Sequence, residues 1–79
     1  MPYTYILYST KLNKYYVGAC VDLKRRLNEH NIGHSKYTST GIPWILKHTE
    51  IFESLPEAKK REFAIKKMKS RKYIERLFS

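Results

Sequence analysis

The sequence predicts a small α+β domain with its elements in the order strand, strand, helix, strand, helix, helix. Two runs of aromatic and β-branched residues near the N-terminus, 3–9 and 14–21, predict the first two strands. Two helix-start signals follow, an aspartate at position 22 and a Ser-x-x-Glu capping box from Ser54 to Glu57. Because 79 residues suffice for one small core and contain neither a linker nor a repeat, we expect 1–79 to fold as a single domain.

The first two strands form a predicted hairpin across the polar turn "TKLNK". Alternation along residues 3–9 places Tyr3, Tyr5 and Leu7 on one face of the first strand, with Thr4, Ile6 and Tyr8 on the other. The segment "LKRRLNEHNI" follows Asp22 and predicts a helix that ends at Gly33, a residue that tolerates the left-handed conformation.

The second half of the chain begins with "GHSKYTSTGIP", which predicts a polar loop over 33–43. A third strand is expected over 44–52, although Lys47 and His48 break its alternation. The capping box predicts a helix that runs to about Met68, and Ser70 predicts a cap for a short final helix. The apolar stripe of that last helix consists of Tyr73, Ile74, Leu77 and Phe78.

The charge of the chain points to a polyanionic partner. The formal net charge is +9, and the basic end is the C-terminal third, where 56–79 holds nine Lys or Arg against three Asp or Glu. Cationic side chains release counterions from a phosphate backbone, which favours nucleic acid ahead of an anionic membrane. A basic domain with no such partner is the alternative.

Other classes of protein fit the sequence poorly. A single cysteine, Cys20, excludes an internal disulfide and favours a reducing compartment. The apolar runs are far too short to cross a membrane, and the N-terminus shows no basic-then-apolar leader. We therefore expect a cytoplasmic protein with no membrane association and no stable protein partner.

Charged side chains interrupt the apolar stripes of both main helices. In the first helix, the positions that share a face with Leu23 and Leu27 also include Arg26 and His30. In the second, Glu62 stands between Ala58 and Ile65. An ionised group directed inward needs a cation, a metal or water beside it. The alternatives are an Arg26–Glu62 ion pair that joins the helices, an arginine that extends its head to solvent, or a site for phosphodiester cleavage.

These residues carry a resemblance to a known family. Tyr16-Val17-Gly18 resembles the second signature of the GIY-YIG nucleases, and Tyr3-Thr4-Tyr5 keeps the final tyrosine of the first. Downstream, "DLKRRLNEHN" is similar to the helix that carries the family's catalytic arginine, and "KREFAIKK" to the segment that carries its metal-binding glutamate. The resemblance covers essentially the whole chain and is closest to the small stand-alone members.

The resemblance implies a fold and a set of site residues. It implies a three-stranded antiparallel sheet flanked by helices, with the active site on the sheet between the helices. It assigns catalysis to Tyr5, Tyr16, Arg26, His30 and Glu62, with Glu62 as the ligand of Mg²⁺ or Mn²⁺. In this scheme Tyr5 orients or deprotonates the attacking water, Tyr16 adds a hydrogen bond, and Arg26 stabilises charge on the phosphate. His30 either shuttles the proton or fixes Tyr5 in place, and Gly18 leaves room for the phosphate.

The activity implied is that of a divalent-metal-dependent endonuclease that hydrolyses DNA, structure-dependent or weakly sequence-specific, in DNA repair or recombination. RNA is an alternative substrate, and a non-catalytic nucleic-acid-binding module with the same fold is the alternative function. No asparagine follows Asn31, so the asparagine that some family members carry after the glutamate has no counterpart. The expected contacts to the DNA backbone are Lys59, Lys60, Lys66, Lys67, Lys69, Arg71 and Lys72.

Overall fold

A computed structural model describes residues 1–33 and 36–78 and confirms the predicted order of elements. The strands are β1 (Tyr3–Ser9), β2 (Lys14–Cys20) and β3 (Trp44–Ile51). The helices are α1 (Leu23–Asn31), α2 (Lys36–Ser39), α3 (Leu55–Met68) and α4 (Arg71–Arg76). Each of the long helices begins within a residue or two of the predicted signal.

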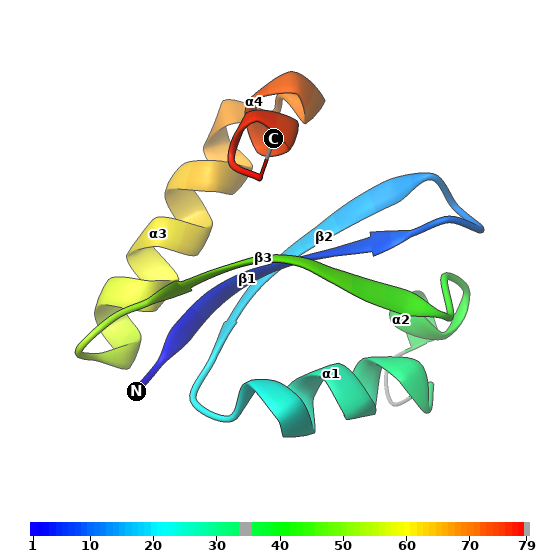
Figure 1. The fold of residues 1–79 in the computed structure, drawn as a ribbon, viewed down its shortest axis with the longest axis horizontal. Coiled ribbons are helices and arrows are strands. Elements are labelled where there is room, and N and C mark those ends of the chain that lie inside the picture. The colour runs from blue at the N-terminus through cyan, green and yellow to red at the C-terminus, as the bar shows by residue number, and fades with distance from the viewer. Residues whose placement is uncertain (34–35, 79) are drawn as a thin grey trace.

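The three strands form one antiparallel sheet in the order β2-β1-β3. Figure 1 shows α1 and α2 on one side of this sheet and α3 and α4 on the other. The first strand of the chain is therefore the central one, and the helices cover it from both sides. The flanked antiparallel sheet that the family resemblance implied is confirmed.

Burial along β1 follows from its central position. All of Thr4, Tyr5, Ile6 and Leu7 are buried, so the alternation of the strand divides apolar groups between two small cores. Tyr5 and Leu7 belong to the core beneath α1, together with Cys20 and Trp44. Ile6 belongs to the core beneath α3, together with Val17 and Ile65. The predicted division of the two faces is confirmed for these residues.

Side-chain caps start three of the helices at the predicted positions. The Asp22 carboxylate accepts a hydrogen bond from the backbone N–H of Arg25 at 3.1 Å. Ser54 Oγ accepts from the N–H of Glu57 at 3.4 Å and donates to the Glu57 carboxylate at 3.0 Å. Ser70 Oγ accepts from the N–H of Tyr73 at 3.1 Å. Each cap satisfies a backbone donor that the helix itself leaves open.

The prediction of a continuous polar loop over 33–43 is wrong in its described part, because Lys36–Ser39 forms the short helix α2. Residues 34 and 35 lie outside the described residues. The hydroxyls that favoured a loop instead bond back to the carbonyls of this turn: Ser39 Oγ donates to Lys36 O and Thr40 Oγ1 to Tyr37 O. The indole of Trp44 then donates to Thr38 O at 2.7 Å, which ties α2 to β3.

The irregularity expected in the third strand is a β-bulge. Ile6 pairs with His48 and Leu7 pairs with Leu46, so Lys47 is an extra residue between two consecutive pairs. The alternation of β3 changes phase at this point, which explains why its sequence pattern broke there.

The C-terminal helix closes the core beneath α3. Its predicted apolar stripe, Tyr73, Ile74, Leu77 and Phe78, packs against the cluster that contains Ile65. Arg71 also donates to both the backbone carbonyl and the side-chain oxygen of Asn13, at 2.8 Å and 2.7 Å, and so joins α4 to the β1–β2 turn. The C-terminal helix is therefore joined both to this core and to the β1–β2 turn.

Replacing Ile65 with alanine tests the role of this core. Ile65 is 1% exposed, so the variant leaves a cavity and should lose about 2–5 kcal/mol of unfolding free energy in urea denaturation. Met68→Ala, three residues later and 53% exposed, is the matched control and should change stability by no more than about 0.5 kcal/mol. Equal losses in the two variants would contradict the division into cores described above.

Candidate active site

A cleft of about 530 Å³ lies along β2, the strand at one edge of the sheet. Tyr5 reaches it from β1, Tyr16 lines it from β2, Arg26 from α1 and Glu62 from α3. The helices α1 and α3 lie on opposite sides of the sheet (Figure 1), and residues from both of them line the cleft. Four of the five predicted catalytic residues thus converge on one cleft, and His30 lies behind it.

Tyr5 is the most buried of these residues, with 2% of its surface exposed. Its hydroxyl lies 3.1 Å from Nε2 of His30, which is itself buried. Burial raises the pKa of Tyr5, and the neighbouring Tyr16 and Cys20 raise it further. Arg26 lowers that pKa, but burial outweighs this effect. The net shift of the Tyr5 pKa is upward, so the protein alone favours the protonated hydroxyl.

Gly18 has a different role from the one expected. A Cβ atom at this position would lie 2.4 Å from Oη and 2.5 Å from Cζ of Tyr5, because the two residues are paired across the β1–β2 ladder. The space that glycine provides is filled by the Tyr5 ring and is not left for a phosphate. Gly18 thus leaves space for the Tyr5 ring beside the edge strand, where the Tyr5 hydroxyl meets His30.

Aromatic rings surround His30 on the side of the cleft. The Tyr16 ring centroid is 4.8 Å from that of His30 and 6.0 Å from that of Trp44, in edge-on contacts. Tyr16 is only half-buried, and Nζ of Lys66 lies 5.9 Å from its ring centroid. Tyr16 is therefore the more accessible of the two signature tyrosines.

Arg26 and Glu62 do not point into the core, which corrects the prediction made from helical spacing. The Arg26 side chain is 49% exposed and pairs with Glu29 at 3.4 Å. The Glu62 side chain is 23% exposed and pairs with Lys66 at 2.5 Å. Both residues stand at the margin of their apolar stripe, where a long side chain reaches the cleft instead of the core. Each forms its ion pair within its own helix, so these contacts do not support the alternative of an Arg26–Glu62 ion pair between the helices.

Asp22, Glu29 and Glu62 line the cleft, and Glu62 is the carboxylate to which the family resemblance assigned a divalent cation. No group of three or more His, Cys, Asp or Glu side chains within 1–33 and 36–78 is arranged to hold a metal ion. Mg²⁺, however, is commonly held by one or two carboxylates together with water and the phosphates of the substrate. Glu62, partly exposed on the wall of the cleft, fits that mode of binding once its oxygen is released from Lys66.

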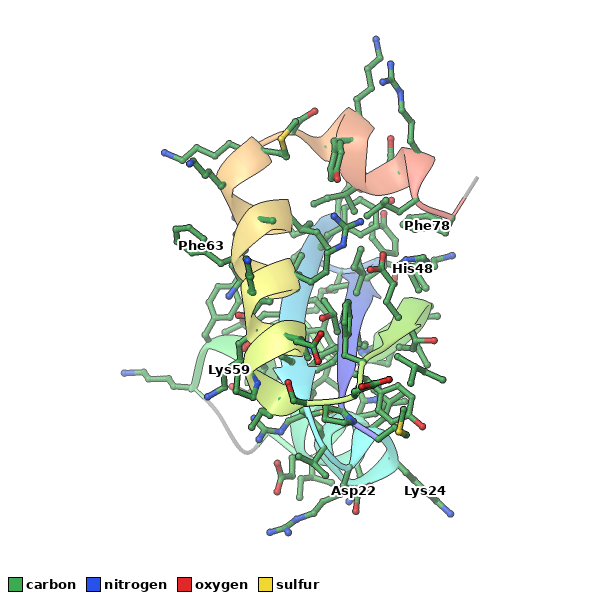
Figure 2. All side chains as sticks on the ribbon, turned by 90° about the vertical axis from the view of Figure 1, so that its left-hand side faces the viewer. Asp22, Lys24, His48, Lys59, Phe63 and Phe78 are labelled. Atoms are coloured by element: carbon green, nitrogen blue, oxygen red, sulfur yellow. The ribbon has the colours of Figure 1, made fainter. Side chains whose placement is uncertain are left out.

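The predicted DNA-backbone residues divide into two groups. Lys59 lines the cleft, and Figure 2 shows it on the same side of α3 as Phe63. Lys60, Lys67, Lys69 and Lys72 are exposed. Lys66 and Arg71 instead have protein partners, Glu62 for the former and Asn13 and Glu75 for the latter. Binding of phosphate by those two residues would compete with these contacts.

Sequence reasoning missed two residues that line the cleft, Arg25 and Glu29. The Arg25 side chain is 76% exposed and pairs with Glu29 at 3.3 Å. The four-residue spacing of Arg25 and Glu29 on the helix was the available signal.

No helix of the described part of the chain is long and apolar enough to cross a membrane.

Comparisons with known proteins identify the family to which the chain is similar. A family model described as the GIY-YIG catalytic domain matches residues 1–74. A UPF0213 protein of Halobacterium salinarum is 48% identical over 65 residues, which are 81% of this chain and 83% of that protein. A UPF0213 protein of Listeria welshimeri is 49% identical over 71% of this chain and 63% of its own length. The solution structure of a UPF0213 protein from Bacillus halodurans has a TM-score of 0.59 at 35% identity, covering 98% of this chain and 82% of that one.

The packing of Tyr5 on Gly18 predicts the effect of a single methyl group. Gly18→Ala should lose about 1–3 kcal/mol of unfolding free energy, because the Tyr5 ring must move. Leucine at position 5 lacks the two atoms nearest to the added methyl group, Oη and Cζ of Tyr5. In a Tyr5→Leu background, Gly18→Ala should therefore lose little unfolding free energy, and the double-mutant cycle should report a large coupling between the two positions. Additive losses in urea denaturation would show that the clash is not with Tyr5.

The raised pKa of Tyr5 predicts a loss of stability in alkali. A tyrosine in the unfolded chain ionises at about pH 10, whereas folding favours the protonated form of Tyr5. The contribution of Tyr5 to the unfolding free energy is therefore complete below that pH and declines above it. Above about pH 10, the unfolding free energy of the wild type should fall more steeply than that of Tyr5→Phe, by at most about 1.4 kcal/mol per pH unit. Parallel pH dependences of the two proteins would contradict this.

Proposed function

The chain belongs to the family of GIY-YIG catalytic domains, and on that premise we propose that it is a divalent-metal-dependent endonuclease that hydrolyses phosphodiester bonds in DNA. The observation that carries the proposal is the convergence of Tyr5, Tyr16, Arg26 and Glu62 on one cleft at the edge of the sheet. Binding alone does not require a carboxylate there, because Glu62 would repel a phosphate in the absence of a cation.

Cations around the cleft would hold the scissile phosphate. Arg26 presents a planar guanidinium that can form paired hydrogen bonds with two phosphate oxygens, and half of its side chain is already exposed. Lys59, on the opposite wall, would hold a neighbouring backbone position. Because Arg26 donates to the oxygens that gain charge in the transition state, its contribution to the rate exceeds its contribution to binding.

Glu62 is the residue proposed to hold Mg²⁺ or Mn²⁺, which when bound would supply charge neutralisation at the phosphate and at the departing 3′ oxygen. Before binding the cation, Glu62 must exchange its contact with Lys66. Lys66 lies near the Tyr16 ring and can then turn toward the DNA backbone. In the absence of substrate, the Lys66 ammonium thus compensates the charge of the Glu62 carboxylate.

Tyr5 and His30 are proposed to act as a pair. A Tyr5 phenolate is unfavourable because burial raises the pKa of this residue. The hydroxyl can nevertheless accept a proton from water while it passes its own proton to His30 Nε2, provided that this nitrogen is the unprotonated one. Tyr16, which is more exposed, would orient the water or the phosphate by a hydrogen bond.

The preference of the enzyme is proposed to be for DNA structure, with weak sequence specificity, in DNA repair or recombination. The exposed lysines of α3 and its C-terminal continuation, Lys60, Lys67, Lys69 and Lys72, would contact the backbone, which carries no direct sequence information. The +9 charge gives such contacts a steep dependence on salt. The second candidate, a non-catalytic binding module with the same basic surface, shares these features but needs neither Glu62 nor the Tyr5–His30 pair.

Replacing Glu62 separates the two candidates. The wild type should nick supercoiled plasmid and branched DNA with Mg²⁺ or Mn²⁺ and not with EDTA. Glu62→Gln should lower that rate at least about 100-fold, the scale seen when one charge-stabilising group is removed from an active site, and leave DNA affinity nearly unchanged. Glu53→Gln, an exposed carboxylate outside the cleft, is the matched control and should cut at the wild-type rate.

The opposite outcomes are equally informative. Cutting by Glu62→Gln at the wild-type rate would remove Glu62 from the mechanism. Salt-sensitive binding by all three proteins with no cutting by any of them would favour the binding module.

A further inference from the structure

A second groove continues from the cleft along the edge strand. It has a volume of about 510 Å³ and shares Tyr16 with the cleft, so the two hollows adjoin at that residue. Its walls come from β2 on one side, from the ends of α3 and α4 on another, and from Tyr37 of α2. None of the proposed catalytic groups other than Tyr16 lies in it.

The charge of this groove is of one sign. Lys14, Lys66, Lys69 and Arg71 line it, and no carboxylate does among the described residues, whereas Asp22, Glu29 and Glu62 line the cleft. Arg71 is held by Asn13 and Glu75, with its guanidinium 5.1 Å from the Tyr15 ring centroid. Lys14 and Lys69 are exposed and remain the two cations best placed to meet a phosphate.

Tyr37 adds an exposed aromatic surface. It is 51% exposed although it is a large ring, and its centroid is 6.4 Å from that of Tyr16 with the two planes inclined by 34°. Exposed rings beside a track of cations are the arrangement by which proteins hold single-stranded nucleic acid, since any base can stack on them. A duplex offers no such face, because its bases are already stacked on one another.

We infer that this groove binds unpaired nucleotides next to the scissile phosphate, with a base stacked on Tyr37 and backbone phosphates at Lys14 and Lys69. The inference rests on the proposed function, which places the phosphate in the cleft, and it names the substrate class: DNA with a single-stranded segment at the cleavage point. A groove of 510 Å³ has the size of a small-molecule pocket, about 300–1,000 Å³, and takes one or two nucleotides instead of a duplex.

The test compares binding of a hairpin duplex that carries a short single-stranded tail, 5′ or 3′, with binding of the blunt hairpin. Affinities are measured in EDTA by fluorescence anisotropy, so that they do not depend on cutting. At least one tailed hairpin should bind the wild type about tenfold more tightly than the blunt hairpin does. A tenfold difference in affinity lies within the range expected for the stacking of one base on an aromatic ring. Tyr37→Ala should remove most of this difference, and Tyr37→Phe, which keeps the ring, should preserve it.

Charge variants provide a second line of evidence. Lys14→Gln should weaken binding of the tailed hairpin and reduce the slope of log affinity against log salt by about 0.7, the value for one single-strand phosphate contact. Lys47→Gln, on the edge strand at the opposite side of the sheet, is the matched control and should leave the ratio of tailed to blunt affinities unchanged. Should Tyr37→Ala fail to fold by circular dichroism, Lys14→Gln decides the question.

Failure of the inference is distinct from failure of the proposed function. Equal affinity of the wild type for tailed and blunt hairpins, or a preference that survives both Tyr37→Ala and Lys14→Gln, would overturn the groove assignment even if plasmid is cut. Loss of the preference in these variants would support it even if no cutting is observed, and the protein would then be a binding module for unpaired DNA.

Discussion

The fold and the site both depend on the burial of β1 on its two faces. A chain of 79 residues has few apolar groups, and a central strand allows one element to serve two cores. Ile6 anchors α3 and α4 on one face, while Tyr5 and Leu7 anchor α1 on the other. Tyr5 therefore supports the core and reaches the cleft with the same ring, and Gly18 is the neighbour that makes its path across the edge strand sterically possible.

The position of the cleft at the edge of the sheet determines its electrostatics. Residues of α1 and α3, which lie on opposite sides of the sheet, line one cleft beside β2. Arg26 and Glu62 therefore reach the same cleft from the two sides of the sheet. Each charge is balanced within its own helix, by Glu29 and by Lys66. Neither charged side chain therefore has to be buried for the protein to fold. Arg26 and Glu62 can exchange their partners within the helices for a ligand in the cleft while the helices stay folded.

The sequence predicted the elements well because their signals are local. Asp22, Ser54 and Ser70 start helices through bonds to backbone groups three residues on, and the break at Lys47 in the third strand marked the bulge. Helical spacing placed Arg26 in the core stripe but does not describe how far a long side chain extends. The packing of Tyr5 on Gly18 was not predicted because it depends on cross-strand register, and α2 was missed because hydroxyls favour loops and single turns alike.

The bulge at Lys47 also bears on the behaviour of the protein at high concentration. Among the described residues, no strand pairs with the outer side of β3, and the exposed residues of β3 include Ile45, Leu46 and Ile51. A regular, apolar edge of this kind is a template for pairing with the same strand of another molecule and so for aggregation. The extra residue breaks the even row of backbone donors and acceptors at mid-strand, and it places a cation there. The irregularity that disturbed the alternation of β3 therefore opposes edge-to-edge association and favours solubility.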